Sequence, residues 1–179
     1  LKDNGLYENT IIIFAGDNGL AVGQHGLMGK QNVYEHSVGV PLMIKAAAQH
    51  TGKKTADLCY LRVVFLILCD MLQLPVPHSV DGISLLSSLD GKEPVRDYLY
   101  YSYMDNQRGI SDGTWKLIEY HVNGKRTTQL FNLKNDPWER NDLSGQKKYE
   151  KTILRLREKM AEEQKRTNDT SVFWNNFSY

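Results

Sequence analysis

Four polar residues near the start of the chain have types and spacing suited to chemistry. Asp17 and Asn18 stand between glycines directly after the apolar run Thr10 to Ala15, and His25 and Lys30 follow within about a dozen residues. A carboxylate and an amide oxygen are hard ligands that suit Ca²⁺ or Mg²⁺ better than zinc or copper. A lysine ammonium can hold an anionic ester oxygen, and a histidine can donate a proton or orient a group near neutral pH.

Each of these residues also has an ordinary structural interpretation. An Asp-Asn-Gly sequence after a strand is a common turn, and a single His or Lys in a loop is usually solvated. Calcium takes roughly six to eight oxygen ligands, so Asp17 and Asn18 would need other residues, water or a bound anion to complete the shell. The hypothesis of a site therefore depends on the joint pattern.

The elements around these residues are typical of an α/β protein. The β-branched run Thr10 to Ala15 predicts a strand buried on both faces, as in a parallel or mixed sheet. Ligands of open α/β sheets gather beyond the carboxyl ends of strands, which is where Asp17 lies. Residues 20–37 are glycine-rich and predict a loop folded over a polar site, and Val38 to Ile44 predicts a second core strand.

A helix is expected next, capped by Thr55 or Asp57 and ending near Gln73, where Pro75 and Pro77 follow. Its apolar residues go nearly all the way round, which predicts deep packing. Cys59 and Cys69 lie in this segment and are expected to be core thiols, because their spacing suits neither a zinc knuckle nor a mutual disulfide.

The second half of the chain predicts a small antiparallel sheet with one helix. Asp112-Gly113 and Asn123-Gly124 are two-residue hairpin signals that would join the last three of four strands. The strand candidates are Tyr98 to Tyr103, Arg108 to Ser111, Trp115 to His121 and Thr127 to Leu133. The apolar residues Tyr149, Ile153, Leu156 and Met160 recur at helical spacing and predict an amphipathic helix covering one face of the sheet. Four aromatic residues of the tail are expected to dock on the body: Phe173, Trp174, Phe177 and Tyr179.

Composition excludes several functions. A net charge of +1 gives no nucleic-acid footprint, so any anion must be handled locally. The apolar run Val63 to Cys69 is too short to cross a bilayer, and no signal-like segment opens the chain at Leu1. We therefore expect no membrane span and no nucleic-acid partner, and the start at Leu1 is typical of a fragment.

Five ordered segments carry a family resemblance that covers roughly residues 5 to 145. They are Thr10-Ile-Ile-Ile-Phe-Ala-Gly-Asp-Asn-Gly19 with Gly23-Gln-His-Gly-Leu-Met-Gly-Lys30, Tyr34-Glu-His-Ser-Val-Gly-Val-Pro41, Val80-Asp-Gly-Ile-Ser-Leu85, Ile110-Ser-Asp-Gly-Thr-Trp-Lys-Leu117, and Gln129-Leu-Phe-Asn-Leu133 with Asp136-Pro-Trp-Glu139. Together they resemble the second half of the type I sulfatases, the formylglycine-dependent members of the alkaline-phosphatase superfamily.

The resemblance implies roles for the four polar residues. It implies that Asp17 and Asn18 are ligands of an active-site calcium, with magnesium as a possible substitute, and that Lys30 is a catalytic residue that contacts the sulfate. His25 matches a position that faces the substrate, so it is carried over as a catalytic and substrate-binding residue. The implied substrate is a sulfated small molecule or glycan, and the implied location is the periplasm, the lysosome or the cell exterior, because the family is commonly exported.

Departures from the family pattern define what this chain is expected to lack. The nucleophile of the family comes from a Cys/Ser-x-Pro/Ala-x-Arg motif, and neither Cys59 nor Cys69 stands in such a motif. We therefore expect the missing amino-terminal half of the domain to supply the nucleophile and the isolated chain to be inactive. The helix around residues 63–68 also lacks an Asp and a Pro-Thr pair common in the family, and Gly39 stands where an Arg is common.

The expected architecture is the carboxyl-terminal part of an alkaline-phosphatase-like mixed sheet with helices, followed by the small subdomain. Residues 1–94 would belong to the catalytic α/β domain and residues 95–179 to the sheet-and-helix subdomain. Two alternatives stay open. One is a phosphoester or phosphonate hydrolase of the same superfamily, and the other is a non-catalytic remnant acting as a binding module, which would fold cooperatively by itself. Against the second, we expect the isolated chain to expose apolar surface along Thr10 to Ala15 and Val38 to Ile44, because neighbouring strands are absent.

Overall fold

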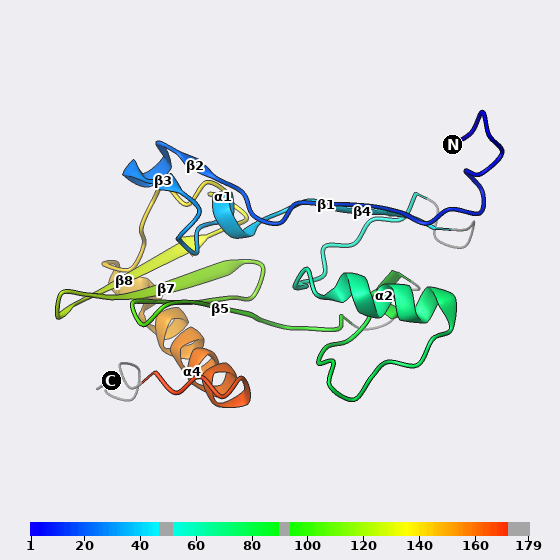
Figure 1. Cartoon of the computed structure of the whole chain (residues 1–179). Helices are drawn as coiled ribbons and strands as arrows, with labels where there is room; N and C mark the ends of the chain where they lie inside the picture. Colours follow the sequence, from blue (N-terminus) through cyan, green and yellow to red (C-terminus); the bar gives the residue numbers. More distant parts are fainter. Residues whose placement is uncertain (47–51, 90–93, 172–179) are drawn as a thin grey trace. The chain divides into compact units, whose positions relative to one another are not determined.

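The computed structural model describes residues 1–46, 52–89 and 94–171, and these form two compact units (Figure 1). The first unit contains Leu1–Asp17 and Val40–Asp97, and the second contains Asn18–Gly39 and Tyr98–Tyr179. The first unit holds β1 (Ile12–Ala15), β4 (Leu42–Lys45), α2 (Val63–Leu72) and α3 (Leu86–Leu89). The second unit holds β2 (Ala21–Val22), η1 (Gln24–Gly26), β3 (Met28–Gly29), α1 (Glu35–Val38), β5 (Leu99–Tyr103), β6 (Gln107–Ser111), β7 (Trp115–Val122), β8 (Lys125–Asn132), η3 (Lys147–Tyr149) and α4 (Glu150–Arg166). The predicted α/β class, with a four-stranded antiparallel sheet and a carboxyl-terminal helix, is confirmed.

In the first unit, β1 pairs with β4 in an antiparallel ladder that runs from Ile12 opposite Lys45 to Ala15 opposite Leu42. Because side chains alternate along a strand, Leu42 and Ile44 point to one face of the pair and pack against the α2 core of Val63 and Ile67. This alternation leaves the opposite face of the pair without cover from the described residues of the unit.

Two sequence expectations for these strands need correction. The run Thr10 to Ala15 is not buried on both faces, since the cross-strand partners Phe14 and Met43 are 58% and 60% exposed. The second strand begins at Leu42 and not at Val38, because Val38 ends the helical turn α1 and Pro41 has no N–H to donate to a ladder.

Helix α2 is shorter than its sequence pattern predicts. Thr55 accepts a hydrogen bond from the Asp57 backbone N–H at 3.1 Å, which caps a local turn instead of a helix. The helix begins at Val63, and it ends as expected before Gln73, whose φ of 53° closes the last turn ahead of Pro75. Its packing is one-sided, since Ile67 is buried and Phe65 is 46% exposed.

In the second unit the four predicted strands form one meander with the order β5-β6-β7-β8. The hairpin between β7 and β8 turns at Asn123 and Gly124, with φ angles of 51° and 75°. Both angles lie in the left-handed region that a two-residue turn requires and that Asn and Gly tolerate. The Asn-Gly and Asp-Gly signals therefore marked the hairpins correctly.

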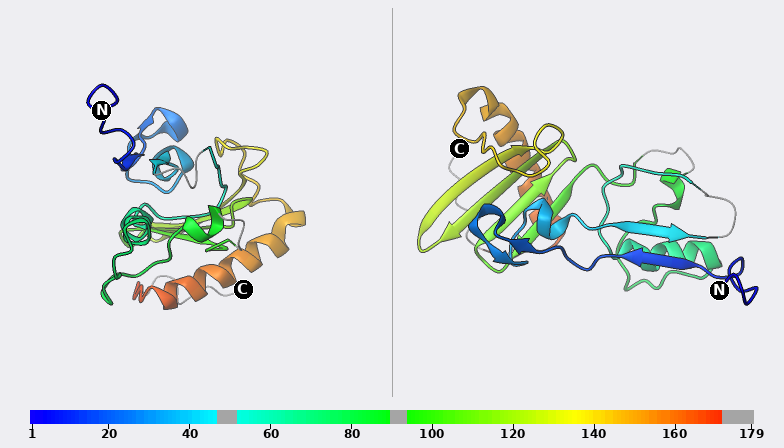
Figure 2. Two further views of the ribbon diagram at one scale, coloured as in Figure 1. Left: turned by 90° about the vertical axis from the view of Figure 1, so that its right-hand side faces the viewer. Right: turned by 90° about the horizontal axis from the view of Figure 1, so that it is seen from above.

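The two faces of this sheet carry different covers (Figure 2). Helix α4 lies on one face, where Ile153, Leu156 and Met160 pack against Leu117 and other buried strand residues. On the opposite face, Val33 and Tyr34 pack against Ile118 and Phe131. The folded segment 18–39, which contains β2, β3 and α1, is thus attached to the face opposite α4.

Both cysteines are free thiols, with Cys69 buried and Cys59 half-buried, as a core role predicts. Burial raises the pKa of the Cys59 thiol, which keeps it in the unreactive neutral form. In the described ranges, no helix is long and apolar enough to cross a bilayer. The tail residues Phe173, Trp174, Phe177 and Tyr179 lie outside the described residues.

Candidate active site

The proposed metal ligands follow β1 after one residue, Gly16. Asp17 is the last residue of the first unit's opening segment, Asn18 is the first residue of the second unit, and both side chains are exposed. Gly19 then donates its N–H to the Ser37 carbonyl at 3.0 Å. A Cβ at this glycine would lie 1.9 Å from the His36 carbonyl oxygen, so only glycine fits there and the chain after Asn18 is held against α1.

His25 is held in a defined orientation within the second unit. Its backbone has a φ of 54°, and its ring stacks on Tyr34 with centroids 4.0 Å apart and planes inclined by 6°. The ring Nε2 lies 3.2 Å from the Trp138 carbonyl oxygen. A carbonyl can only accept, so Nε2 carries the hydrogen, and in the neutral ring Nδ1 is then the acceptor.

Tyr34 is the support on which His25 stacks. Its hydroxyl donates to Gln129 Oε1 of β8 at 2.6 Å, and its backbone N–H donates to Asn32 Oδ1 at 3.1 Å. The Tyr34 ring also meets Phe131 edge-on with a centroid distance of 6.0 Å. The His25 imidazole therefore stacks on the Tyr34 ring, whose position is fixed by contacts with strand β8.

Lys30 lies on the same folded segment, one residue after β3, and its side chain is exposed. The structure thus places His25 and Lys30 in one unit, on segment 18–39, together with Asn18. It stacks His25 with Tyr34 and with His36, whose ring centroid is 5.5 Å from that of His25.

A cluster of buried charges lies beneath this segment. Lys116 of β7 is fully buried, and its Nζ lies 2.8 Å from Glu35 Oε1 and 3.1 Å from Glu139 Oε1. Glu139 is 1% exposed, and its other oxygen accepts the Glu35 backbone N–H at 2.6 Å. Burial raises the pKa of Glu139, while the Lys116 charge opposes that rise.

A surface hollow of about 520 Å³ adjoins His25 in the second unit; it is lined by Gln24, His25, His36, Trp138, Glu139 and Arg140. Burial, and then the nearby charges of His25 and Lys116, lower the pKa of His36, which favours its neutral form. Its Nε2 is buried and has no hydrogen-bond partner among the residues the structure describes. The imidazole of His36 and the exposed indole of Trp138 therefore both lie at the border of the hollow.

The donor set fits a hard divalent cation but does not complete its shell. Asp17 and Asn18 offer oxygen atoms, the ligand type that calcium and magnesium take. Across residues 1–46, 52–89 and 94–171, no group of three or more His, Cys, Asp or Glu side chains is placed to hold a metal. These two residues could therefore hold only part of a calcium shell.

Lys116 and Glu139 were not among the site residues that the sequence predicted. A signal was available, because Lys116 and Glu119 interrupt an apolar stretch of β7, and charges inside a buried strand must be paired. The sequence does not show which carboxylate pairs with Lys116, since Glu35 lies 81 residues away from it.

Comparison with known proteins identifies the class of the chain. Residues 23–166 match the family described as N-sulphoglucosamine sulphohydrolase, C-terminal. The chain therefore belongs to this family of sulfatase carboxyl-terminal domains, within the alkaline-phosphatase-like superfamily.

Particular relatives agree with this assignment. The chain is 29% identical over 182 residues to N-acetylglucosamine-6-O-sulfatase of Bacteroides thetaiotaomicron, covering 94% of this chain and 32% of that protein. A solved structure in complex with its substrate D-glucosamine-2-N,6-O-disulfate is 27% identical, with a TM-score of 0.84 over 95% of this chain and 37% of that one. Phosphonate monoester hydrolase of Agrobacterium radiobacter is 25% identical, with a TM-score of 0.75 over 93% of this chain and 37% of that one. The chain thus spans about a third of the length of the relatives it matches.

Proposed function

We propose that the protein carrying this chain hydrolyses a sulfate ester and that this chain supplies one wall of the active site. Asp17 and Asn18 would be calcium ligands, and Lys30 and His25 would contact the sulfate and the substrate. The observation that carries the proposal is the match of residues 23–166 to a sulfatase carboxyl-terminal family. The position of the Asp-Asn pair shortly after β1 supports it.

The chemistry assigned to each group follows from its charge. A bound calcium would lower the energy of negative charge on the sulfuryl oxygens. The Lys30 ammonium would stabilise the same oxygens as the S–O bond breaks. His25, with its hydrogen on Nε2 held by the Trp138 carbonyl, would present Nδ1 as a hydrogen-bonding atom toward the substrate.

The nucleophile is proposed to come from sequence outside this chain, so that the isolated chain does not turn over substrate. Residues 1–94 are proposed as part of the catalytic α/β domain and residues 95–179 as the small subdomain. The substrate class is proposed to be a sulfated saccharide, on the strength of the structural neighbour that holds a disulfated glucosamine.

The test is turnover of glucosamine-6-sulfate by the complete protein with calcium present. Asp17→Ala and Lys30→Ala should each lower kcat/KM by about 100-fold or more, since single stabilising groups of this kind contribute on that order. Removal of calcium by a chelator should abolish turnover and added calcium should restore it. As a matched control, Lys159→Ala changes an exposed lysine of α4 paired with Glu162 and should leave turnover unchanged.

Normal turnover by the Asp17 and Lys30 variants would overturn the assigned roles. Clear turnover by the isolated chain, lost on changing Asp17, would show that the nucleophile lies within it. A second candidate function, phosphonate or phosphate ester hydrolysis, is favoured by the 25% identical phosphonate monoester hydrolase. It predicts that a phosphonate monoester is turned over faster than the sulfate ester.

A further inference from the structure

The buried residue Glu139 is connected to two of the proposed site residues, Asn18 and His25, through two series of contacts. Glu139 is 1% exposed and has a φ of 53°, a left-handed conformation that is uncommon for a residue with a side chain. Such a conformation persists only where the surrounding structure holds it in place. The contacts of Glu139 therefore stabilise this conformation.

The first route runs through α1 to the metal pair. Glu139 Oε2 accepts the N–H of Glu35, the first residue of α1, at 2.6 Å. Two residues further on, the Ser37 carbonyl accepts the Gly19 N–H at 3.0 Å. Gly19 has no room for a side chain against α1, so the position of α1 determines the position of Gly19 and of its neighbour Asn18.

The second route runs through the peptide that precedes Glu139. The carbonyl of Trp138 accepts from His25 Nε2 at 3.2 Å. A displacement of Glu139 would move that carbonyl with it, because the two residues share a peptide plane. One buried side chain therefore influences both the ring orientation of His25 and the backbone beside Asn18.

Lys116 makes this arrangement possible. A buried carboxylate without a partner would take up a proton or draw in water, since burial disfavours its charge. The Lys116 ammonium lies 3.1 Å from Glu139 and 2.8 Å from Glu35, and it comes from the central strand β7. The Lys116 ammonium thus binds the carboxylates of both Glu35 and Glu139 to strand β7.

We propose that Glu139, neutralised by Lys116, is a positioning residue that sets where Asn18 and His25 lie. In this proposal it acts on the site through the Glu35 N–H and the Trp138 carbonyl. The catalytic consequence rests on the proposed sulfatase function, whereas the positioning itself is a property of the second unit alone.

The same strand offers a matched control. Glu119 of β7 is 2% exposed and pairs with Arg157 of α4 at 2.7 Å. It stands three residues from Lys116 and therefore faces the opposite side of the sheet. Glu119→Ala removes a buried carboxylate from the sheet without touching segment 18–39.

The experiment measures amide hydrogen exchange and His25 ring nitrogen shifts in the complete protein, together with turnover of glucosamine-6-sulfate. Glu139→Ala should raise the exchange rates of the Glu35 and Gly19 amides at least tenfold and remove the fixed Nε2–H tautomer of His25. It should lower kcat at least tenfold and weaken calcium binding. Glu119→Ala should leave the two amides, the tautomer and the calcium affinity within threefold of the original protein.

The double variant Lys116→Met/Glu139→Gln guards against simple unfolding. It removes both charges and keeps an amide oxygen that can accept from Glu35, so it should keep the two amides within threefold of the original. Unchanged exchange in Glu139→Ala, or equal loosening of the two amides in Glu119→Ala, would overturn the proposal.

The readouts separate this proposal from the proposed function. If the original protein turns over no sulfate ester but Glu139→Ala loosens Gly19 and Glu35 selectively, the positioning stands and the sulfatase assignment fails. If sulfate ester turnover depends on Asp17 and Lys30 but neither turnover nor the exchange of the two amides responds to Glu139→Ala, the function stands and the positioning fails.

Discussion

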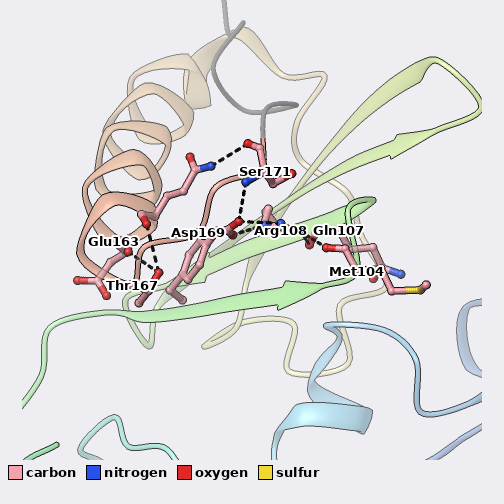
Figure 3. A network of polar contacts seen from close by, with 9 residues as sticks. Met104, Gln107, Arg108, Glu163, Thr167, Asp169 and Ser171 are labelled. Atoms are coloured by element: carbon pink, nitrogen blue, oxygen red, sulfur yellow. Dashed lines mark hydrogen bonds and ion pairs between the residues drawn. The ribbon is translucent and has the colours of Figure 1, made fainter. Parts of the chain in front are cut away.

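The guanidinium of Arg108 in β6 grips the carboxylate of Asp169 with two contacts, Nε to Oδ2 at 2.6 Å and Nη2 to Oδ1 at 3.1 Å (Figure 3). Asp169 follows α4 and also accepts from the Tyr100 hydroxyl at 2.6 Å. Arg108 is 3% exposed, and its Nη1 donates to the carbonyls of Met104 and Gln107. The pair therefore ties the end of the helix to the sheet it covers.

We predict that Asp169→Asn destabilises the protein by about 3 kcal/mol, because it leaves the buried Arg108 charge without its counter-ion. Denaturant unfolding followed by circular dichroism measures the change. Glu162→Gln is the control, since it breaks the exposed Lys159–Glu162 pair and should cost less than about 0.5 kcal/mol. Equal effects of the two substitutions would show that burial of Arg108 does not matter.

The same carboxylate predicts a pH dependence with a definite sign. Burial opposes its ionisation, but the hydrogen bonds from Arg108 and Tyr100 hold the pKa of Asp169 below its ordinary value. A lowered folded-state pKa means that the carboxylate stabilises the fold above its unfolded pKa and that this contribution is lost as pH falls through the folded one. The original protein should therefore lose more stability than Asp169→Asn between about pH 5 and about pH 3. Parallel stability curves for the two proteins over that range would contradict this account.

The small sheet could be predicted from sequence because its determinants are local. Asn123 and Gly124 specify the β7–β8 turn whatever surrounds them, and the spacing of Ile153, Leu156 and Met160 specifies the buried face of α4. The burial of strand β1 and helix α2 could not be read from their apolar patterns, because exposure of Phe14 and Phe65 depends on which elements are present to cover them. An apolar pattern shows which residues can be buried and not which of them are.

The residues of the candidate site could be predicted from the sequence, but the contacts that position them could not. Asp17, Asn18, His25 and Lys30 stand close together in sequence, so their residue types alone suggested a site. The contacts that hold segment 18–39 on the sheet could not be predicted from residue types, because they join distant residues. Gln129, which accepts a hydrogen bond from the Tyr34 hydroxyl, lies 95 residues from Tyr34. Long-range contacts of this kind depend on the folded sheet, which brings the strand ends and the segment together.

The packing of α4 on the sheet predicts how much stability is lost when its leucines are shortened. Leu156 is fully buried against Ile110, Leu117 and Leu130, so Leu156→Ala should create a cavity and cost about 2–5 kcal/mol. Leu154 on the same helix is 39% exposed, and Leu154→Ala should cost well under about 1 kcal/mol. Thermal unfolding of the two variants checks the difference, and a similar loss in both would mean that α4 does not pack in the described register.

The β7–β8 turn allows backbone strain to be separated from packing, because two glycines with open surroundings differ in their φ angle. A Cβ at Gly124 or at Gly145 would meet no atom within 4 Å, but Gly124 has a φ of 75° and Gly145 has no such positive angle. Gly124→Ala should therefore destabilise the protein by about 1 kcal/mol through strain alone. Gly145→Ala should be neutral or stabilise it by up to about 1 kcal/mol, since alanine narrows the unfolded ensemble. The difference between their unfolding midpoints isolates the φ effect, and a loss of stability in Gly145→Ala as large as in Gly124→Ala would refute it.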